Sequence, residues 1–257
     1  EIFVRPDQIW EEFKKVVTLI LDVYKDFGLT NYKFRLSLRD PADKEKYFDD
    51  DQMWNEAENK LREVLNEFGC PYTEAIGEAA FYWPKLDVEV KPAVGPEVTL
   101  STCQLDFLLP RRFKLEYTDK DGEKKTPVVI HRAIFGTFDR FTAFLLEETK
   151  WVFPFWLAPE QVKILPVADP FMDYADKVCE DLKKENISAS VDTSSDSLNK
   201  KIRNAELMKI PYILIVGEKE VNSNGVSVRV FKTKEQYEQS EADFIKAAVE
   251  KRDTRAL

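Results

Sequence analysis

The chain has 257 residues, of which 44% are hydrophobic and 33% are charged, and its formal net charge is −9. These values are typical of a globular protein with one large domain or two modest ones, and they exclude an intrinsically disordered chain. They also exclude nucleic-acid binding through bulk positive charge, so any phosphate contact must come from a local basic patch. The candidate patches are Arg111, Arg112 and Lys114, and then Lys200, Lys201, Arg203 and Lys209.

The cysteine and hydropathy patterns predict where the protein works. Cys70, Cys103 and Cys179 show no Cys-x-x-Cys spacing and cannot all pair, which favours a reducing compartment, the cytoplasm. The most apolar stretch, residues 151–159, contains two prolines and is too short to cross a membrane. We therefore expect no membrane association.

The first part of the chain alternates between helical and strand periods. Pro6 begins a helix whose apolar residues recur every three or four positions until Gly28. Residues 32–38 alternate apolar and polar side chains, which predicts a half-buried strand. Acidic residues 49–51 are placed to cap a second helix, residues 52–68. We reject a metal site at these acids, because their spacing is not that of a calcium loop.

An antiparallel sheet is expected next. Segments with a period of two lie at residues 86–90, 97–107 and 113–117. The pair Asp121-Gly122 predicts a hairpin turn that leads into a further strand.

A strand-to-helix passage then carries the two side chains that look most reactive. The buried strand at residues 127–130 ends at His131, the only histidine of the chain, and Thr137 is placed to cap the following helix. Arg140 lies in the first turn of that helix, where the helix dipole disfavours a cation unless an anion is nearby. This points to a polyanionic ligand. The alternatives are a hydrogen-bonded structural histidine and an arginine that is solvated or paired with Asp139.

A second domain is predicted from about residue 160, after a link with prolines at 154 and 159 around an aromatic cluster. Strand-like runs alternate there with helix-like runs, which is typical of an α/β layered fold. The strands are expected at residues 161–167, 188–191, 212–216 and 226–231, and the helices at residues 171–184, 196–208 and 235–251.

Several segments together carry a family resemblance. The run His-Arg-Ala-Ile-Phe-Gly-Thr-Phe-Asp-Arg-Phe at 131–141 resembles motif 3 of class II aminoacyl-tRNA synthetases, in the form that the threonyl-tRNA synthetase family has. The segments that agree, in order along nearly the whole chain, are Leu-Ser-Leu-Arg-Asp-Pro (36–41), Gly-Glu-Ala-Ala-Phe-Tyr (77–82), Ser-Thr-Cys-Gln-Leu-Asp-Phe (101–107), Phe-Trp-Leu-Ala-Pro-Glu-Gln-Val (155–162) and Leu-Asn-Lys-Lys-Ile-Arg (198–203).

The resemblance implies both a fold and a function. Residues 1–158 would form an N-terminally truncated class II catalytic core, an α+β fold on an antiparallel sheet, with motif 3 and the tail of motif 2. Residues 159–257 would form a three-layer α/β anticodon-binding domain. The intact parent would be a homodimeric threonine–tRNA ligase that activates threonine with ATP and Mg²⁺ and transfers it to threonine tRNA.

The resemblance also assigns site residues by position. Arg140 matches the motif 3 arginine and is the catalytic candidate, and His131 matches one ligand of a zinc ion that grips threonine in this family. Four positions lie beside ATP, namely Lys85, Thr99, Thr137 and Arg140, and two lie around threonine, namely Tyr82 and Gln104. Arg203, Glu220 and Arg229 match positions that contact the anticodon.

Parts of the family pattern are absent. They are motif 1, nearly all of motif 2, the zinc cysteine and the second zinc histidine, where Glu1 stands. One histidine cannot hold zinc, so the chain alone is expected to be inactive, and the alternative is a non-catalytic tRNA-binding or regulatory relative. Thr99 stands where many members carry glutamine. Trp83 and Trp151 stand where glycine is typical, either because the source reads UGA as glycine or because the synthetase is degenerate.

Overall fold

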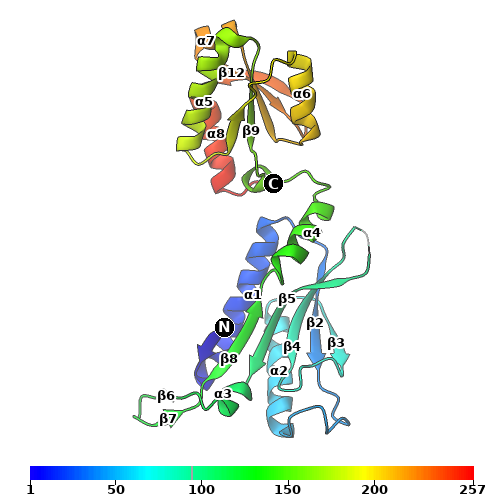
Figure 1. Ribbon diagram of the computed structural model, residues 1–257. Helices are drawn as coiled ribbons and strands as arrows, with labels where there is room; N and C mark the ends of the chain where they lie inside the picture. The colour runs from blue at the N-terminus through cyan, green and yellow to red at the C-terminus, as the bar shows by residue number, and fades with distance from the viewer. Residues whose placement is uncertain (94) are drawn as a thin grey trace. The chain divides into compact units, whose positions relative to one another are not determined.

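The computed structural model describes residues 1–93 and 95–257 and divides into two compact units, Glu1–Glu147 and Glu148–Leu257 (Figure 1). The family-based boundary between residues 158 and 159 stays a prediction. No helix in the described ranges combines the length and the apolar character needed to cross a membrane.

The first unit is built on a six-stranded sheet with the order β1-β8-β5-β4-β2-β3. All neighbouring strands run antiparallel except β2 and β3, which are parallel because the helix α2 connects them as a crossover. The predicted antiparallel core is therefore confirmed, while β3 and its parallel pairing were missed. The strands are β1 (Ile2–Val4), β2 (Tyr32–Leu38), β3 (Tyr72–Ile76), β4 (Lys85–Val90), β5 (Val98–Asp106) and β8 (Val128–Ala133).

Two long helices contribute buried apolar residues to the core of this unit. α1 (Ile9–Asp26) follows a short 3-10 turn and buries one apolar side, and its Tyr24 hydroxyl lies 2.7 Å from the Ser101 hydroxyl on β5. α2 (Asp51–Glu67) is capped by Asp50, whose carboxylate accepts the backbone N–H of Met53 at 3.0 Å. Both helices were predicted from their periodicity, and the acidic cap was also predicted.

One predicted strand of the first unit is wrong. Residues 113–117 do not form a strand, because Pro110 fits the first turn of a short helix, α3 (Leu109–Arg112), and Lys114 ends that turn with φ of 55°. Only β6 (Tyr117–Thr118) remains, and it pairs with β7 (Lys124–Lys125) around the predicted hairpin turn. The helix after β8 is α4 (Phe138–Glu148), and the Thr137 hydroxyl accepts the backbone N–H of Arg140 at 3.3 Å, as the predicted cap requires.

The second unit is a three-layer α/β fold. Its sheet has the order β10-β9-β11-β12-β13, in which β10, β9 and β11 are parallel and the last two are antiparallel. One apolar cluster joins α5 and α8 to the sheet, and a separate cluster joins α6 to it, so helices cover both faces (Figure 1). The elements are β9 (Val162–Pro166), α5 (Met172–Lys184), β10 (Ala189–Val191), α6 (Leu198–Leu207), β11 (Tyr212–Val216), α7 (Glu218–Ser223), β12 (Gly225–Val230), β13 (Gln236–Ser240) and α8 (Glu241–Asp253).

The helix predicted from residue 235 begins later. Residues 236–240 pair with β12 as an edge strand, and tertiary pairing overrides the weak local pattern there. Ser240 then caps α8 by accepting the backbone N–H of Asp243 at 3.1 Å.

Candidate functional site

Three of the predicted site residues form one row across three adjacent strands. Lys85 on β4 lies opposite Gln104 on β5, and Gln104 lies opposite His131 on β8. Directly opposed residues share one face of a sheet, so all three side chains lie on the same face. Tyr82, from the loop before β4, donates its hydroxyl to Gln104 Oε1 at 2.5 Å, and its ring centre lies 6.2 Å from that of His131. The structure thus brings four predicted residues together.

A buried carboxylate that the sequence pattern did not single out holds part of this row. Asp87 on β4 is 1% exposed and accepts from Lys85 Nζ at 2.9 Å, from the Thr102 hydroxyl at 2.9 Å, and from Arg35 Nη2 at 3.2 Å. Thr102 in turn accepts from Gln104 Nε2 at 3.2 Å. Because Asp87 is surrounded by donors, it fixes the directions of the Lys85 and Gln104 side chains.

A second buried carboxylate orients the histidine. Asp106 is fully buried, and its Oδ2 lies 2.9 Å from His131 Nε2. Its Oδ1 accepts the backbone N–H groups of Leu108 and Leu109, each at 2.9 Å. Histidines that bind metals commonly donate their other ring nitrogen to such a carboxylate, which leaves one nitrogen free for a ligand. Here His131 Nδ1 lies 2.5 Å from Glu1 Oε2.

The described residues do not make a zinc site. In residues 1–93 and 95–257, no group of three histidine, cysteine or acidic side chains is placed to hold a metal ion. Cys103 lies one residue from Gln104 on β5, but it points to the buried face of the sheet, where burial raises the pKa of its thiol and disfavours the thiolate that binds metals. His131 therefore offers a single ligand.

The predicted ATP residues divide between two places. Lys85 lies in the row described above, whereas Arg140 and Thr137 lie at the start of α4, and Arg140 Nη1 is 3.5 Å from the carbonyl oxygen of Thr99. A bulge in β5 keeps Thr99 on the face of the row, because Thr99 opposes Glu89, four residues beyond Lys85 on β4. Lys85 and the Thr99 position are therefore separated by about 13 Å along the strand direction.

Trp83 does not lie in this row. Its ring is 1% exposed and packs against Trp54 and Phe107, with ring centres 5.6 Å and 4.1 Å away. Its indole N–H has no partner in the part of the chain that the structure describes, which is unfavourable for a buried donor. The large ring of Trp83 is therefore accommodated in the core of the first unit.

The three predicted anticodon residues also divide. Arg229 on β12 donates from Nε and Nη2 to Glu206 Oε1 at 3.0 Å and 2.9 Å, and this bonding holds the pKa of the Glu206 carboxyl below its usual value. Arg203 is exposed and lies one helical turn before Glu206 on α6, so the two residues are neighbours on the helix surface. Glu220 is separate: its carboxylate accepts the backbone N–H of Gly217 at 2.9 Å and lines a hollow of about 180 Å³.

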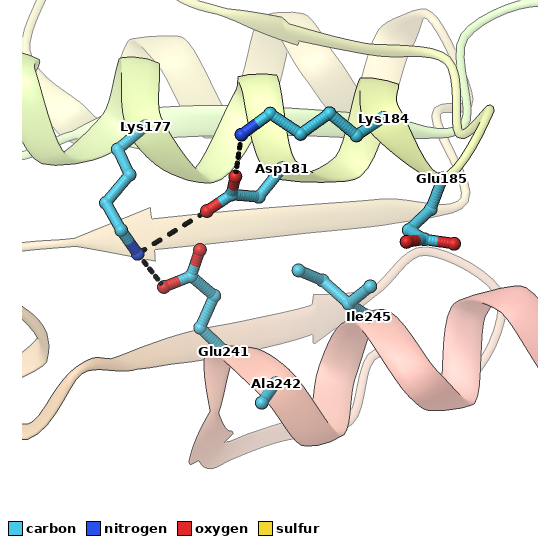
Figure 2. Close-up of a pocket in the computed structure, with 7 residues that line it drawn as sticks. All are labelled: Lys177, Asp181, Lys184, Glu185, Glu241, Ala242 and Ile245. Atoms are coloured by element: carbon cyan, nitrogen blue, oxygen red, sulfur yellow. Dashed lines mark hydrogen bonds and ion pairs between the residues drawn. The ribbon is translucent and has the colours of Figure 1, made fainter.

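A larger hollow, of about 340 Å³, lies between α5 and α8 and contains none of the predicted residues (Figure 2). Lys177 there bridges Glu241 at 2.6 Å and Asp181 at 3.5 Å, and Lys184 holds Asp181 at 2.7 Å. Glu241 is 7% exposed, so Lys177 compensates a largely buried negative charge. These ion pairs fasten α8 to α5.

Comparisons with known proteins agree with this architecture. Residues 1–149 match the family model of the tRNA synthetase class II core domain (G, H, P, S and T), and residues 161–251 match the anticodon binding domain. The threonine–tRNA ligases of Staphylococcus carnosus and Staphylococcus aureus are each 58% identical over 245 residues, which is 95% of this chain and 38% of theirs. The chain thus spans little more than a third of these relatives.

Two solved structures are also similar. The RNA binding domain of threonyl-tRNA synthetase from Cryptosporidium parvum superposes with a TM-score of 0.88 at 34% identity, over 97% of this chain and 62% of that one. A chain from Aeropyrum pernix named as a threonyl-tRNA synthetase superposes with a TM-score of 0.79 at 27% identity, over 99% of this chain and 62% of that one. Both units are therefore covered by one continuous similarity.

Proposed function

Because this chain belongs to the class II aminoacyl-tRNA synthetases and corresponds to the C-terminal region of threonyl-tRNA synthetases, we propose that it supplies part of the active site and the anticodon-binding domain of a threonine–tRNA ligase. The parent enzyme would join threonine to threonine tRNA at the expense of ATP, in the cytoplasm and as a homodimer. Three free cysteines fit a reducing compartment.

The observation that carries the proposal is the row of Lys85, Gln104 and His131, with Tyr82 above it, on the polar face of the sheet. Tyr82 and Gln104 would bind threonine, because a hydroxyl and an amide held by neighbours can match its polar groups. Lys85 is fixed by Asp87 and would face a phosphate of ATP. The paired Tyr82 and Gln104 side chains would exchange their mutual hydrogen bond for bonds to the amino acid.

The nucleotide would extend from this row toward the start of α4. Arg140, Thr137 and Thr99 lie there, about 13 Å along the sheet from Lys85. In the first reaction the threonine carboxylate attacks the α-phosphate and pyrophosphate leaves. In the second, a ribose hydroxyl at the 3′ end of the tRNA attacks the carbonyl of threonyl adenylate and AMP leaves. Arg140, Lys85 and Mg²⁺ would offset the negative charge of the phosphates during the first reaction.

The residues of this chain account for part of the zinc site that the family uses to recognise threonine. When bound, zinc would coordinate the amino and hydroxyl groups of threonine and so reject valine. Among the residues that the structure describes, His131 is the one ligand placed for such an ion, and we propose that the others belong to a further part of the parent.

Threonine-dependent exchange of pyrophosphate into ATP tests the proposal. We expect no exchange by the 257-residue chain and zinc-sensitive exchange by the longer parent. In the parent, Gln104→Ala should raise KM for threonine more than KM for ATP, while the exposed substitution Asp22→Asn changes neither. Pyrophosphate exchange by this chain alone would contradict the assignment. An unchanged KM for threonine in the Gln104→Ala parent would also contradict it.

A non-catalytic tRNA-binding relative is the second candidate. It is favoured by the contact of Glu1 with His131 Nδ1, which occupies the nitrogen that a metal would need. A parent that binds threonine tRNA but shows no exchange at any zinc concentration would establish this alternative.

A further inference from the structure

The short helix α3 ends in an exposed turn of unusual composition. Arg111, Arg112, Phe113 and Lys114 follow one another, all four are exposed, and the Phe113 side chain is 72% exposed. In the described part of the chain, none of the three cations forms an ion pair or a side-chain hydrogen bond. We call these four residues the Arg111–Lys114 turn.

The backbone of this turn is well defined. Phe113 N–H bonds to the Leu109 carbonyl at 2.9 Å, and Leu115 N–H bonds to the Pro110 carbonyl at 2.9 Å. Lys114 has φ of 55°, a conformation that a side chain disfavours and that glycine would normally take at this position of a helix end. The turn therefore displays its side chains from a fixed backbone, with a lysine where glycine would suit the backbone better.

The turn is also tied to the proposed active site. Asp106 Oδ1 accepts the N–H groups of Leu108 and Leu109 at the start of α3, while its Oδ2 contacts His131. Because one fully buried carboxylate makes both sets of bonds, the start of α3 and the imidazole are held in a fixed relation. The turn begins two residues after Leu109, so the same carboxylate links the base of the turn to the histidine of the row.

We infer that the Arg111–Lys114 turn binds single-stranded RNA. The identity of this RNA rests on the proposed function, and we infer that it is the unpaired 3′ end of the tRNA. Three uncompensated cations fit the phosphates of a nucleic acid, and an exposed aromatic ring fits the face of an unpaired base. The positive patch stands out in a chain of net charge −9, so it is complementary to a polyanion. The 3′ end is the part of the tRNA that must reach the amino acid.

Binding of threonine tRNA transcripts to the whole chain tests the inference. One transcript is complete, and the other lacks its four 3′-terminal nucleotides. We expect Arg111→Ala with Arg112→Ala to weaken binding of the complete transcript and to lower the slope of log affinity against log salt by about 1.4, from two phosphate contacts at about 0.7 each. Phe113→Leu should weaken it about ten-fold with the slope unchanged. Neither variant should alter binding of the shortened transcript.

The matched control is Lys25→Ala with Lys246→Ala, which removes the same charge from exposed positions far from the turn in sequence. Thermal melting confirms that each variant is folded. Equal losses of affinity for both transcripts, or an equal loss in the control variant, would overturn the inference. It would also be overturned if the chain bound anionic lipid vesicles and the same substitutions weakened that binding. A chain that binds neither transcript would instead refute the proposed function.

Discussion

Replacing Asp106 by asparagine should reverse the tautomer of His131 and destabilise the first unit. In the native chain Asp106 accepts three hydrogen bonds, two from backbone N–H groups and one from His131 Nε2. Asparagine keeps one acceptor oxygen. The amide cannot turn over, because its NH2 group would then face the N–H groups of Leu108 and Leu109. Its NH2 group must therefore face His131 Nε2, which has to lose its proton to accept.

The energetic cost follows from the same contacts. The two backbone bonds survive, while the bond from His131 to a buried carboxylate is replaced by a bond from the neutral asparagine amide to the imidazole. Hydrogen bonds to charged groups contribute about 1.5–3 kcal/mol, so we expect the free energy of unfolding to fall by about 2 kcal/mol. For a unit of this size that corresponds to a melting temperature lower by roughly 4–8 °C.

The assay uses the fact that the chain has a single histidine. With ¹⁵N-labelled histidine, proton–nitrogen correlation at a pH where the imidazole is neutral reports which ring nitrogen carries the proton. The native chain should show the proton on Nε2 and Asp106→Asn should show it on Nδ1, whereas the exposed control Asp22→Asn should match the native chain. An unchanged tautomer in a folded Asp106→Asn variant would refute the geometry proposed for this site.

Three further predictions concern the second unit, and urea unfolding measures each of them. Trp151 has φ of 64° and is 63% exposed, so Trp151→Gly should stabilise the chain by about 1 kcal/mol, and a loss of stability would contradict the reasoning. Lys177→Met should cost about 2 kcal/mol, because it leaves the largely buried Glu241 uncompensated, and Lys177→Met combined with Glu241→Gln should recover most of that loss. The hydrogen bonds from Arg229 hold the pKa of Glu206 below its usual value of 4.5, so this pair stabilises the fold fully above that pH and less as the pH falls through the lowered pKa. Glu206→Gln should remove part of the acid sensitivity below pH 4.5, and an unchanged pH profile would argue against the pair.

The sequence predicted the elements whose burial is one-sided. The strand at residues 32–38 and the two long helices of the first unit were found because each buries a continuous apolar face, which leaves a periodic pattern. The errors fall where local pattern and tertiary context conflict. Residues 113–117 alternate like a strand, but the turn before them is fixed by a carboxylate earlier in the chain, Asp106. Residues 236–240 are a strand only because β12 pairs with them.

The candidate site was predicted only as a set of positions. The resemblance supplied Tyr82, Gln104 and His131, but the register that aligns the last two across β5 and β8 depends on strand pairing and cannot be read from spacing. Asp87 and Asp106 were missed as functional residues, because an acid inside a strand pattern carries no local sign of its partners. The partner of Asp106 is 25 residues away in the sequence, at His131.

Asp106 links the two proposed roles of the first unit, the active site at His131 and RNA binding at the Arg111–Lys114 turn. A carboxylate with two oxygens can satisfy two structures at once, and here one oxygen holds the start of α3 while the other holds His131. A change that displaces the start of α3 would therefore disturb the carboxylate that also contacts the imidazole. Contacts of RNA with the Arg111–Lys114 turn should therefore alter the environment of His131 without touching it. This link can be followed through the same histidine resonance as the complete transcript is added, and it should be absent when the shortened transcript is used.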